Sequence, residues 1–373
     1  MKRESGFSLV ELMVAMAVMI LIVAATVRIL TDAINTVSAM GLMADTQENL
    51  RVGMNYMVRD LSQAGDGIPQ TGISIPSGTI VWPGTSGDFP AAWTALYGIS
   101  PGYEQGPTTT VSGQATDTVT LLYADNTLQD SSFAPNHWLN EFPVNVAATC
   151  PHGSITTSGA SPTQTVTITF DGTNCINVFT EGNTSLNIGD LILLQNNAGS
   201  CGGQTTGLGS TSCDASNPSS STALRVITAI STAGNSITFA PGDAFGLNGG
   251  TLPGGTITAT RIWMISYFIN NSNTQLPLLM REVNLKGAVA VSQVIENLQF
   301  FYDIVNSGQQ NPPTLAAQGD ETPTYAQFPY IRDAYIWLFA RSEQPYQKTG
   351  QYFRQNFVTS VSVRGLDFYN EFK

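Results

Sequence analysis

The residue whose position most directly implies chemistry is Glu11, a carboxylate inside an apolar segment. The segment runs from Phe7 to Val27, contains no other charged residue and is followed by Arg28. Its length is sufficient to cross a hydrocarbon core as a helix. A carboxylate there costs on the order of 2.5–3.5 kcal/mol on insertion scales, so it needs a partner. Two interpretations stay open: an interfacial Glu favoured by the helix dipole, or one that pairs with a positive charge of a neighbouring chain.

A second chemical pattern surrounds Ser100, where residues 98–102 fit the G-x-S-x-G nucleophile motif. That motif needs a helix directly after the serine, and the glycines and prolines that follow, including Gly106, oppose one. A partner histidine could only be His137 or His152, and both lie in Pro/Asn/Gly-rich stretches. No zinc-protease, phosphate-loop or dinucleotide fingerprint occurs. The sequence therefore predicts a protein that is not an enzyme and that needs no cofactor.

Cysteines and acidic residues offer two further kinds of site. Four cysteines in an exported chain suggest two disulfides with three possible connectivities. The pairs Cys150–Cys175 and Cys201–Cys213 are favoured because each closes a local Gly/Ser/Thr-rich loop. A metal site is not expected, because no C-x-x-C occurs and His152 is isolated. Four acidic residues also fail the spacing of an EF-hand loop: Asp125, Asp130, Asp171 and Asp190.

The composition is that of an extracytoplasmic, β-rich and loop-rich protein. Charged residues make up only 11% of the 373 residues, and the formal net charge is −12. Between Arg59 and Arg261 the only basic residue is Arg225. This middle region cannot neutralise a row of phosphates, so nucleic-acid binding through it is excluded.

The N-terminus carries a recognisable motif. Behind a short basic leader stands Gly6-Phe7-Ser8-Leu9-Val10-Glu11-Leu12, which resembles the class III signal of type IV prepilins and type II secretion pseudopilins. The resemblance implies that a prepilin peptidase cuts between Gly6 and Phe7 and methylates the new N-terminus at Phe7. It also implies that Glu11 stabilises the α-amino group of Phe7 in an adjacent subunit during assembly. A conventional signal peptide, the rival interpretation, would have to tolerate Glu11 in its apolar core.

The apolar segment is predicted to begin a helix that continues beyond the membrane. No proline precedes Pro69, and Leu50, Met54, Met57 and Leu61 recur at helical spacing. Asp45, Glu48, Arg51 and Asp60 are assigned to its other faces. The predicted helix spans residues 7–64, and its second half packs on a sheet.

The head after Pro69 is predicted to be β-rich, which makes the fold class α+β: a long helix packed on an antiparallel sheet with a loop-rich β insertion. The organisation comprises a leader (1–6), a transmembrane or filament-core segment (7–28), an amphipathic continuation (29–66), a β-rich region (67–258, insertion at about 128–222) and a C-terminal region (259–373). Residues 289–298 are expected to form a short helix. Aromatic runs at 300–302 and 335–339 are expected to be buried in strands. The predicted strands cover 117–124, 165–170, 190–195, 223–230, 236–239, 261–269, 278–282, 300–304, 334–340 and 357–364.

Several head segments, including 59–65, 188–192 and 294–302, resemble the PilW family of minor pilins and its relative, the J-type pseudopilin of type II secretion. The resemblance implies a single-pass inner-membrane protein with a cytoplasmic N-terminus and a periplasmic head, which enters a pilus at the cell surface. The implied partners are the prepilin peptidase, other minor and major pilins, and the inner membrane. Two alternatives stay open: a type II secretion pseudopilin, and a membrane-anchored tip adhesin whose insertion recognises a ligand.

Overall fold

A computed structural model describes most of the helix and the sheets of the head. The described residues are 8–69, 72–75, 81–85, 87–109, 113–125, 141–144, 153–158, 165–170, 187–196, 222–231, 236–239, 257–305 and 315–363.

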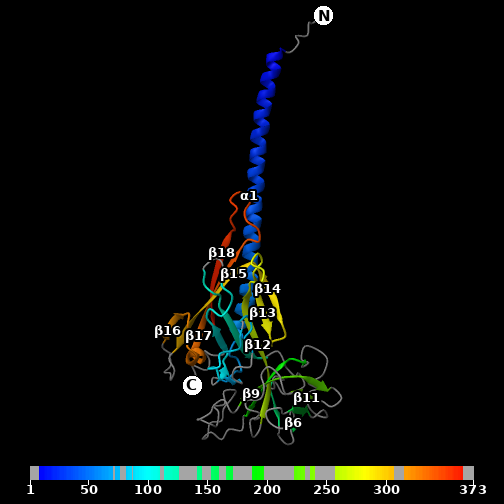
Figure 1. Ribbon diagram of the computed structural model, residues 1–373, viewed down its shortest axis with the longest axis vertical. Coiled ribbons are helices and arrows are strands. Elements are labelled where there is room, and N and C mark those ends of the chain that lie inside the picture. Colours follow the sequence, from blue (N-terminus) through cyan, green and yellow to red (C-terminus); the bar gives the residue numbers. More distant parts are fainter. Residues whose placement is uncertain are drawn as a thin grey trace, which may run out of the picture.

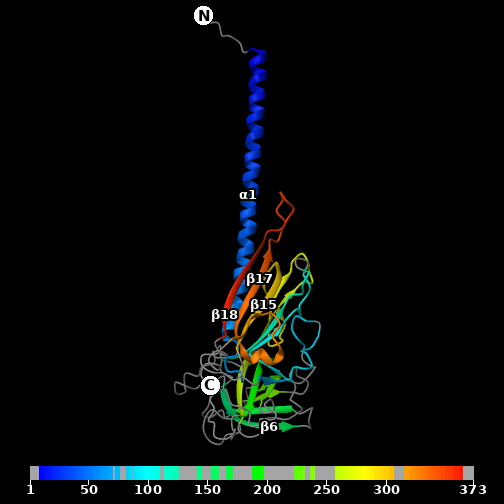
Figure 2. The same cartoon turned by 90° about the vertical axis from the view of Figure 1, so that its left-hand side faces the viewer.

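The dominant element is one helix, α1 (Leu9–Gln63), whose first half projects away from the head (Figure 1, Figure 2). Ser8 caps its start, and Ala64 leaves the helical region with φ −57° and ψ 136°. Gly65 then adopts φ +82°, a conformation that glycine takes without steric cost. The predicted helix over residues 7–64 is therefore confirmed across its described part.

The regular elements in the rest of the described chain are nearly all strands. Its elements are β1 (Ile73–Ser74), β2 (Ala95–Leu96), β3 (Ile99–Gly102), β4 (Thr118–Ala124), β5 (Glu141–Val144), β6 (Gly153–Ser158), β7 (Thr165–Phe170), β8 (Leu191–Asn196), β9 (Thr222–Val226), β10 (Ala229–Ser231), β11 (Ser236–Phe239), β12 (Ile257–Asn270), β13 (Leu278–Val283), β14 (Ala288–Gln293), β15 (Ile295–Val305), β16 (Leu315–Asp320), the 3₁₀ helix η3 (Tyr325–Tyr330), β17 (Ile331–Arg341) and β18 (Arg354–Ser362). The predicted strands at 165–170 and 236–239 match β7 and β11, and the predicted strand at 223–230 is divided into β9 and β10.

Strand β12 organises the larger sheet, which has twelve strands within the described residues. The first part of β12 pairs with β5 and β8, and its last part pairs with β4 and β13, all antiparallel. One long strand thus joins the distal strands to the strands beside α1. In Figure 1 the distal strands β6, β9 and β11 lie at the end of the molecule opposite the N-terminus.

A smaller antiparallel sheet has the order β16-β15-β17-β18 in the described chain. Both sheets pack on the second half of α1, where Leu50, Met54, Met57 and Leu61 are at most 7% exposed. Burying each of these side chains contributes roughly 1.5–3 kcal/mol. The helical stripe predicted from the sequence is therefore the surface that joins α1 to the head.

Gly53 allows the close approach of α1 to the sheet. A Cβ atom at this position would lie 2.9 Å from Leu279 Cδ2 and 3.3 Å from Leu338 Cδ2. Gly41, in the exposed part of the helix, has no atom within 4 Å of such a Cβ. Gly53 is therefore packed tightly against the sheet, whereas Gly41 has open space beside it.

The helix predicted at residues 289–298 is wrong, because the segment forms β14 and the start of β15. Val291, Ile295 and Leu298 stand at helical spacing, but Val294 adopts φ +56°, a strained conformation for a β-branched residue. At this break the chain leaves the larger sheet and enters the smaller one. Pairing of β15 with β17 outweighs the local helical pattern.

The prediction that both aromatic runs are buried holds for two of their six aromatic residues. Phe300 and Tyr302 are 1% exposed and face the core. Phe301 and Trp337 lie on the opposite face, with ring centroids 5.7 Å apart, and are only half-buried. Tyr335 and Phe339 alternate with buried neighbours and share that outer face. Period-two alternation divides the first run between the two faces of the sheet and places all three aromatic residues of the second run on the outer face.

Candidate functional site

The start of α1 is closed by a reciprocal pair of hydrogen bonds between Ser8 and Glu11. The Ser8 backbone N–H donates to Glu11 Oε2 at 3.0 Å, and the Glu11 backbone N–H donates to Ser8 Oγ at 3.4 Å. This capping box satisfies two N–H groups that a helix start otherwise leaves unpaired. The carboxylate therefore lies at the positive end of the helix.

Glu11 is surrounded by an uncovered apolar surface. An 18-residue stretch of this helix has a mean hydropathy of 2.6 and none of it is buried by the rest of the chain, so by length and composition the helix can cross a membrane. Neighbouring side chains such as Leu12 and Met13 are 57% and 63% exposed. An apolar surface of this extent marks contact with lipid or with other chains.

Several predicted site residues lie outside the described residues. Gly6 and Phe7, the predicted cleavage pair, precede the described helix. The same holds for both histidines, His137 and His152, and for the four predicted disulfide cysteines: Cys150, Cys175, Cys201 and Cys213. Within the described ranges no group of three or more potential metal ligands occurs.

The buried carboxylate of Asp60 joins the helix to the larger sheet. Asp60 is fully buried, and its Oδ2 accepts from Tyr267 Oη at 2.6 Å and from Arg281 Nε at 2.7 Å. Burial, reinforced by the Asp60 charge, raises the pKa of Tyr267, which stays a neutral donor. The sequence prediction that Asp60 lies on another face of the helix is wrong. It lies three positions after Met57, on the same side of the helix, so it falls within the buried stripe.

Asp117 links the two sheets. Its Oδ1 accepts from the Glu104 backbone N–H at 2.9 Å, and its Oδ2 accepts from the Phe300 backbone N–H at 2.8 Å. Burial raises the pKa of this carboxyl to about 6, although both hydrogen bonds act in the opposite direction. Because Phe300 in β15 is 183 residues away from Asp117 in the sequence, no local sequence pattern indicates their hydrogen bond.

Asp125 and Asp190 meet at a buried arginine. Arg261 Nε donates to Asp125 Oδ2 at 2.7 Å, and its Nη1 lies 3.4 Å from Asp190 Oδ2. Lys286 Nζ approaches the other oxygen of Asp190 at 2.8 Å. Two acidic residues far apart in the sequence thus share protein cations, as the charge balance of a buried site requires.

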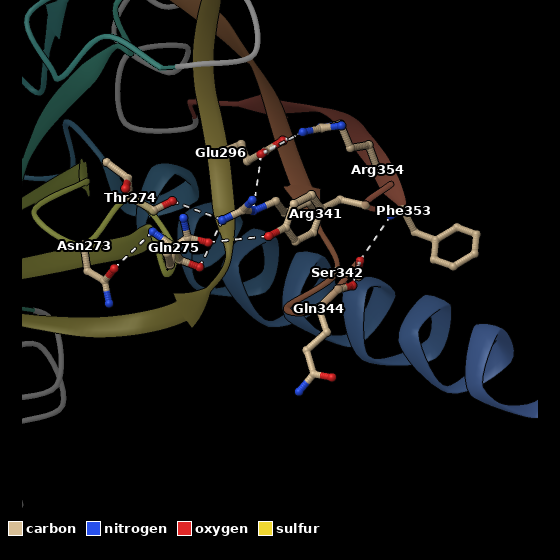
Figure 3. A network of polar contacts seen from close by, with 10 residues as sticks. Asn273, Thr274, Gln275, Glu296, Arg341, Ser342, Gln344, Phe353 and Arg354 are labelled. Carbon is tan, nitrogen blue, oxygen red and sulfur yellow. Dashed lines mark hydrogen bonds and ion pairs between the residues drawn. The ribbon is translucent and has the colours of Figure 1, made fainter. Parts of the chain in front are cut away.

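A polar cluster fixes the point where the β17–β18 hairpin, which runs beside α1, passes into its loop (Figure 1, Figure 3). Glu296 is 6% exposed and pairs with Arg354 Nε at 2.8 Å and with Arg341 Nε at 3.4 Å. Arg341 Nη2 also donates to the backbone oxygens of Thr274 and Gln275 at 3.1 and 3.0 Å. The cluster ties β15, β17, β18 and the β12–β13 turn together.

Ser100, the centre of the nucleophile pattern, lies inside strand β3. Its hydroxyl is buried, and the chain continues into a turn after Gly102. A strand-to-helix turn, which would present the serine as a nucleophile, is not formed there.

The comparisons with known proteins identify the N-terminus. The family described as the prokaryotic N-terminal methylation motif matches residues 1–27. No curated protein and no solved structure matches the chain. The chain thus carries, at the start of a long apolar helix that precedes a β-sheet head, the methylation motif of a type IV pilin or pseudopilin processed by prepilin peptidase.

Proposed function

We propose that this chain is a PilW-type minor pilin. Prepilin peptidase removes residues 1–6 by cutting between Gly6 and Phe7 and methylates the α-amino group of Phe7. The mature chain stays in the bacterial inner membrane through residues 7–28, with its head in the periplasm. It then joins other minor and major pilins in the filament or in its initiating tip. The uncovered apolar segment of α1 over residues 9–27, interrupted only by Glu11, is the observation that carries this proposal.

The capping box suggests how Glu11 acts at two stages. In the isolated chain, Glu11 Oε2 accepts from Ser8, whereas Oε1 accepts no hydrogen bond from any described residue. That oxygen is available for an ammonium group. In a filament the neighbour's Phe7 amine supplies one, and the apolar surroundings strengthen the attraction. Helix burial then provides the association energy, and the Glu11–Phe7 pair sets the axial register.

The test replaces Glu11 with alanine and, separately, with glutamine. Both variants should insert into the membrane and be processed, but incorporation into filaments should fall on the order of tenfold or more, since one unmade charge pair of 1.4 kcal/mol corresponds to that factor. Glu48→Ala, an exposed change on the same helix, serves as the charge-matched control. Normal incorporation of both Glu11 variants would contradict the register mechanism.

The J-type pseudopilin remains the alternative because its N-terminal chemistry is the same. Deletion of the gene separates the two functions: loss of piliation with normal secretion supports a minor pilin, and the reverse result supports a pseudopilin. The proposed disulfides Cys150–Cys175 and Cys201–Cys213 are tested by peptide mapping without reduction. The domain boundaries given above remain proposals, as does the location of any adhesive contact in residues 128–222.

A further inference from the structure

The tip of the β17–β18 hairpin lies beside the part of α1 that directly follows the apolar segment. Lys348 Nζ in the tip is 4.0 Å from Asp32 Oδ1 on the helix. In Figure 1 and Figure 2 the loop, drawn in red, extends along α1 beyond the ends of the sheets. Among the described parts of the head, the tip therefore reaches farthest toward the N-terminal end of the helix.

The height of the tip above the apolar segment follows from the geometry of α1. Asp32 comes five residues after Val27, the last residue of that segment, which places it roughly 7–8 Å farther along the axis. The layer of lipid headgroups on each side of a hydrocarbon core is about 5–7 Å thick. With residues 7–28 in the inner membrane, as the proposed function has it and as this inference requires, the tip lies at the outer edge of the headgroup layer.

Internal contacts hold the tip in a fixed shape. The Tyr346 backbone N–H donates to the Gln351 backbone oxygen at 2.8 Å, and the Gly350 N–H donates to the Tyr346 oxygen at 2.8 Å. The Tyr346 ring lies 5.5 Å from the Phe353 ring. The polar cluster around Glu296 fixes the loop where it leaves the sheet. A surface that is already ordered loses little further freedom when it binds.

The surface of the tip suits lipid headgroups better than the hydrocarbon core. Within residues 342–353, all of which the structure describes, no large apolar side chain is exposed. Tyr346 and Tyr352 are half-buried, and tyrosine is typical of the boundary between lipid and water. The exposed polar side chains include Gln344, Gln347, Lys348, Thr349 and Gln351. Lys348 is the only charged residue between Glu343 and Arg354, so it decides the charge of the tip.

Lys348 is held only weakly by its partner on the helix. The side chains of Lys348 and Asp32 are 64% and 63% exposed. An ion pair this exposed contributes little, because water and salt screen both charges. The phosphates of a lipid layer offer the same ammonium group many anions, and a lysine near an anionic membrane surface strengthens its binding. A long lysine side chain at this height can reach that layer.

We propose that the tip of the β17–β18 hairpin binds the anionic phospholipid headgroups of the membrane that holds α1, with Lys348 against lipid phosphates and both tyrosines at the level of the headgroups. The contact orients the head on the membrane surface while the chain waits there. It is released when the chain leaves the membrane, so it belongs to the stage before filament assembly.

The test places a fluorescent reporter in the tip of the full chain. Tyr346→Trp is inserted into vesicles of phosphatidylethanolamine and phosphatidylglycerol that contain a lipid with a nitroxide on its headgroup. The nitroxide should quench the added tryptophan, and the wild type gives the background of the native tryptophans. Tyr330→Trp, in η3 at the opposite end of the head, is the matched control and should not be quenched above this background (Figure 1).

Lipid charge and the unsubstituted chain supply a second measurement. In vesicles of phosphatidylcholine with the same labelled lipid, quenching of Tyr346→Trp should be weaker, because the surface carries no net charge. The backbone amides of residues 346–351 in the wild type should exchange hydrogen more slowly in the anionic vesicles than in the phosphatidylcholine vesicles.

Two substitutions in the Tyr346→Trp chain separate lipid binding from a brace on α1. Lys348→Gln should lower the ratio of bound to free tips about fivefold and remove the dependence of quenching on salt. Asp32→Asn should leave quenching unchanged or raise it, because it removes the anion that competes for Lys348.

Either of two results would overturn the proposal. One is that Tyr346→Trp is quenched no more than Tyr330→Trp in chains that float with the vesicles. The other is that Lys348→Gln and Asp32→Asn lower quenching equally, which would make their ion pair a brace within the protein. Flotation of the wild type tests the membrane anchor separately. A chain that does not float contradicts the proposed function and this inference with it, whereas one that floats without quenching at the tip contradicts this inference alone.

Discussion

Replacing Asp60 with alanine should remove the buried ionic contact between α1 and the larger sheet. The carboxylate is fully buried and accepts two short hydrogen bonds, one from the buried Tyr267 hydroxyl and one from Arg281. Removing one partner of a buried ion pair costs about 3–5 kcal/mol, since the remaining charge is left without compensation. We therefore expect Asp60→Ala to lower the free energy of unfolding of the full chain by this amount.

The assay is urea-induced unfolding of the full chain in detergent, followed by near-ultraviolet circular dichroism and tryptophan fluorescence. Asp45→Ala is the control, because Asp45 is exposed on the same helix and should change stability by less than about 0.5 kcal/mol. A combined variant, Asp60→Leu with Tyr267→Phe and Arg281→Met, should recover most of the loss, since an apolar replacement of a buried pair is often neutral. Equal stability of Asp60→Ala and Asp45→Ala would show that the buried Asp60 contacts do not stabilise the fold.

Two further predictions concern the contact between the sheets and the helix surface. Because burial raises the pKa of Asp117 from 3.8 to about 6, the folded state binds the Asp117 proton more tightly than the unfolded chain does. Protonation of this carboxyl therefore contributes to the free energy of unfolding; the contribution is complete below about pH 4 and is lost as the pH rises through 6. This difference of about two pKa units corresponds to about 3 kcal/mol. In urea titrations at a series of pH values, the free energy of unfolding of the wild type should fall by about this amount, and that of Asp117→Asn should depend less on pH. Gly53→Leu should destabilise the chain by about 1–3 kcal/mol through overpacking against Leu279, whereas Gly41→Ala should stabilise it by about 0.5–1 kcal/mol, measured by thermal unfolding. Equal effects at the two glycines would contradict the packing assigned to Gly53.

Local sequence patterns correctly predicted the helix and strands in which the periodicity of the apolar side chains matches the face that is buried in the fold. The stripe at Leu50, Met54, Met57 and Leu61 predicted which face of α1 meets the head, and continuous β-formers predicted β7 and β11. The segment around Val294 was mispredicted because a single residue in the left-handed region separates two strands that belong to different sheets. Backbone strain of this kind leaves no periodic signal.

The polar contacts of the head were the least predictable part. Asp60, Asp117 and Glu296 each have a partner that lies more than fifty residues away in the sequence. Only Asp60 carried a local signal, its position within an apolar helical stripe. At the N-terminus, by contrast, Ser8 and Glu11 are three residues apart, so the motif contained the geometry of the capping box.

The most direct test of the central claim is the intact mass of the protein purified from the bacterial envelope. We expect a chain that lacks residues 1–6, begins at Phe7, carries one additional methyl group and fractionates with the inner membrane or the pilus. A mature chain that begins elsewhere, or one released into the periplasm without its apolar helix, would contradict it.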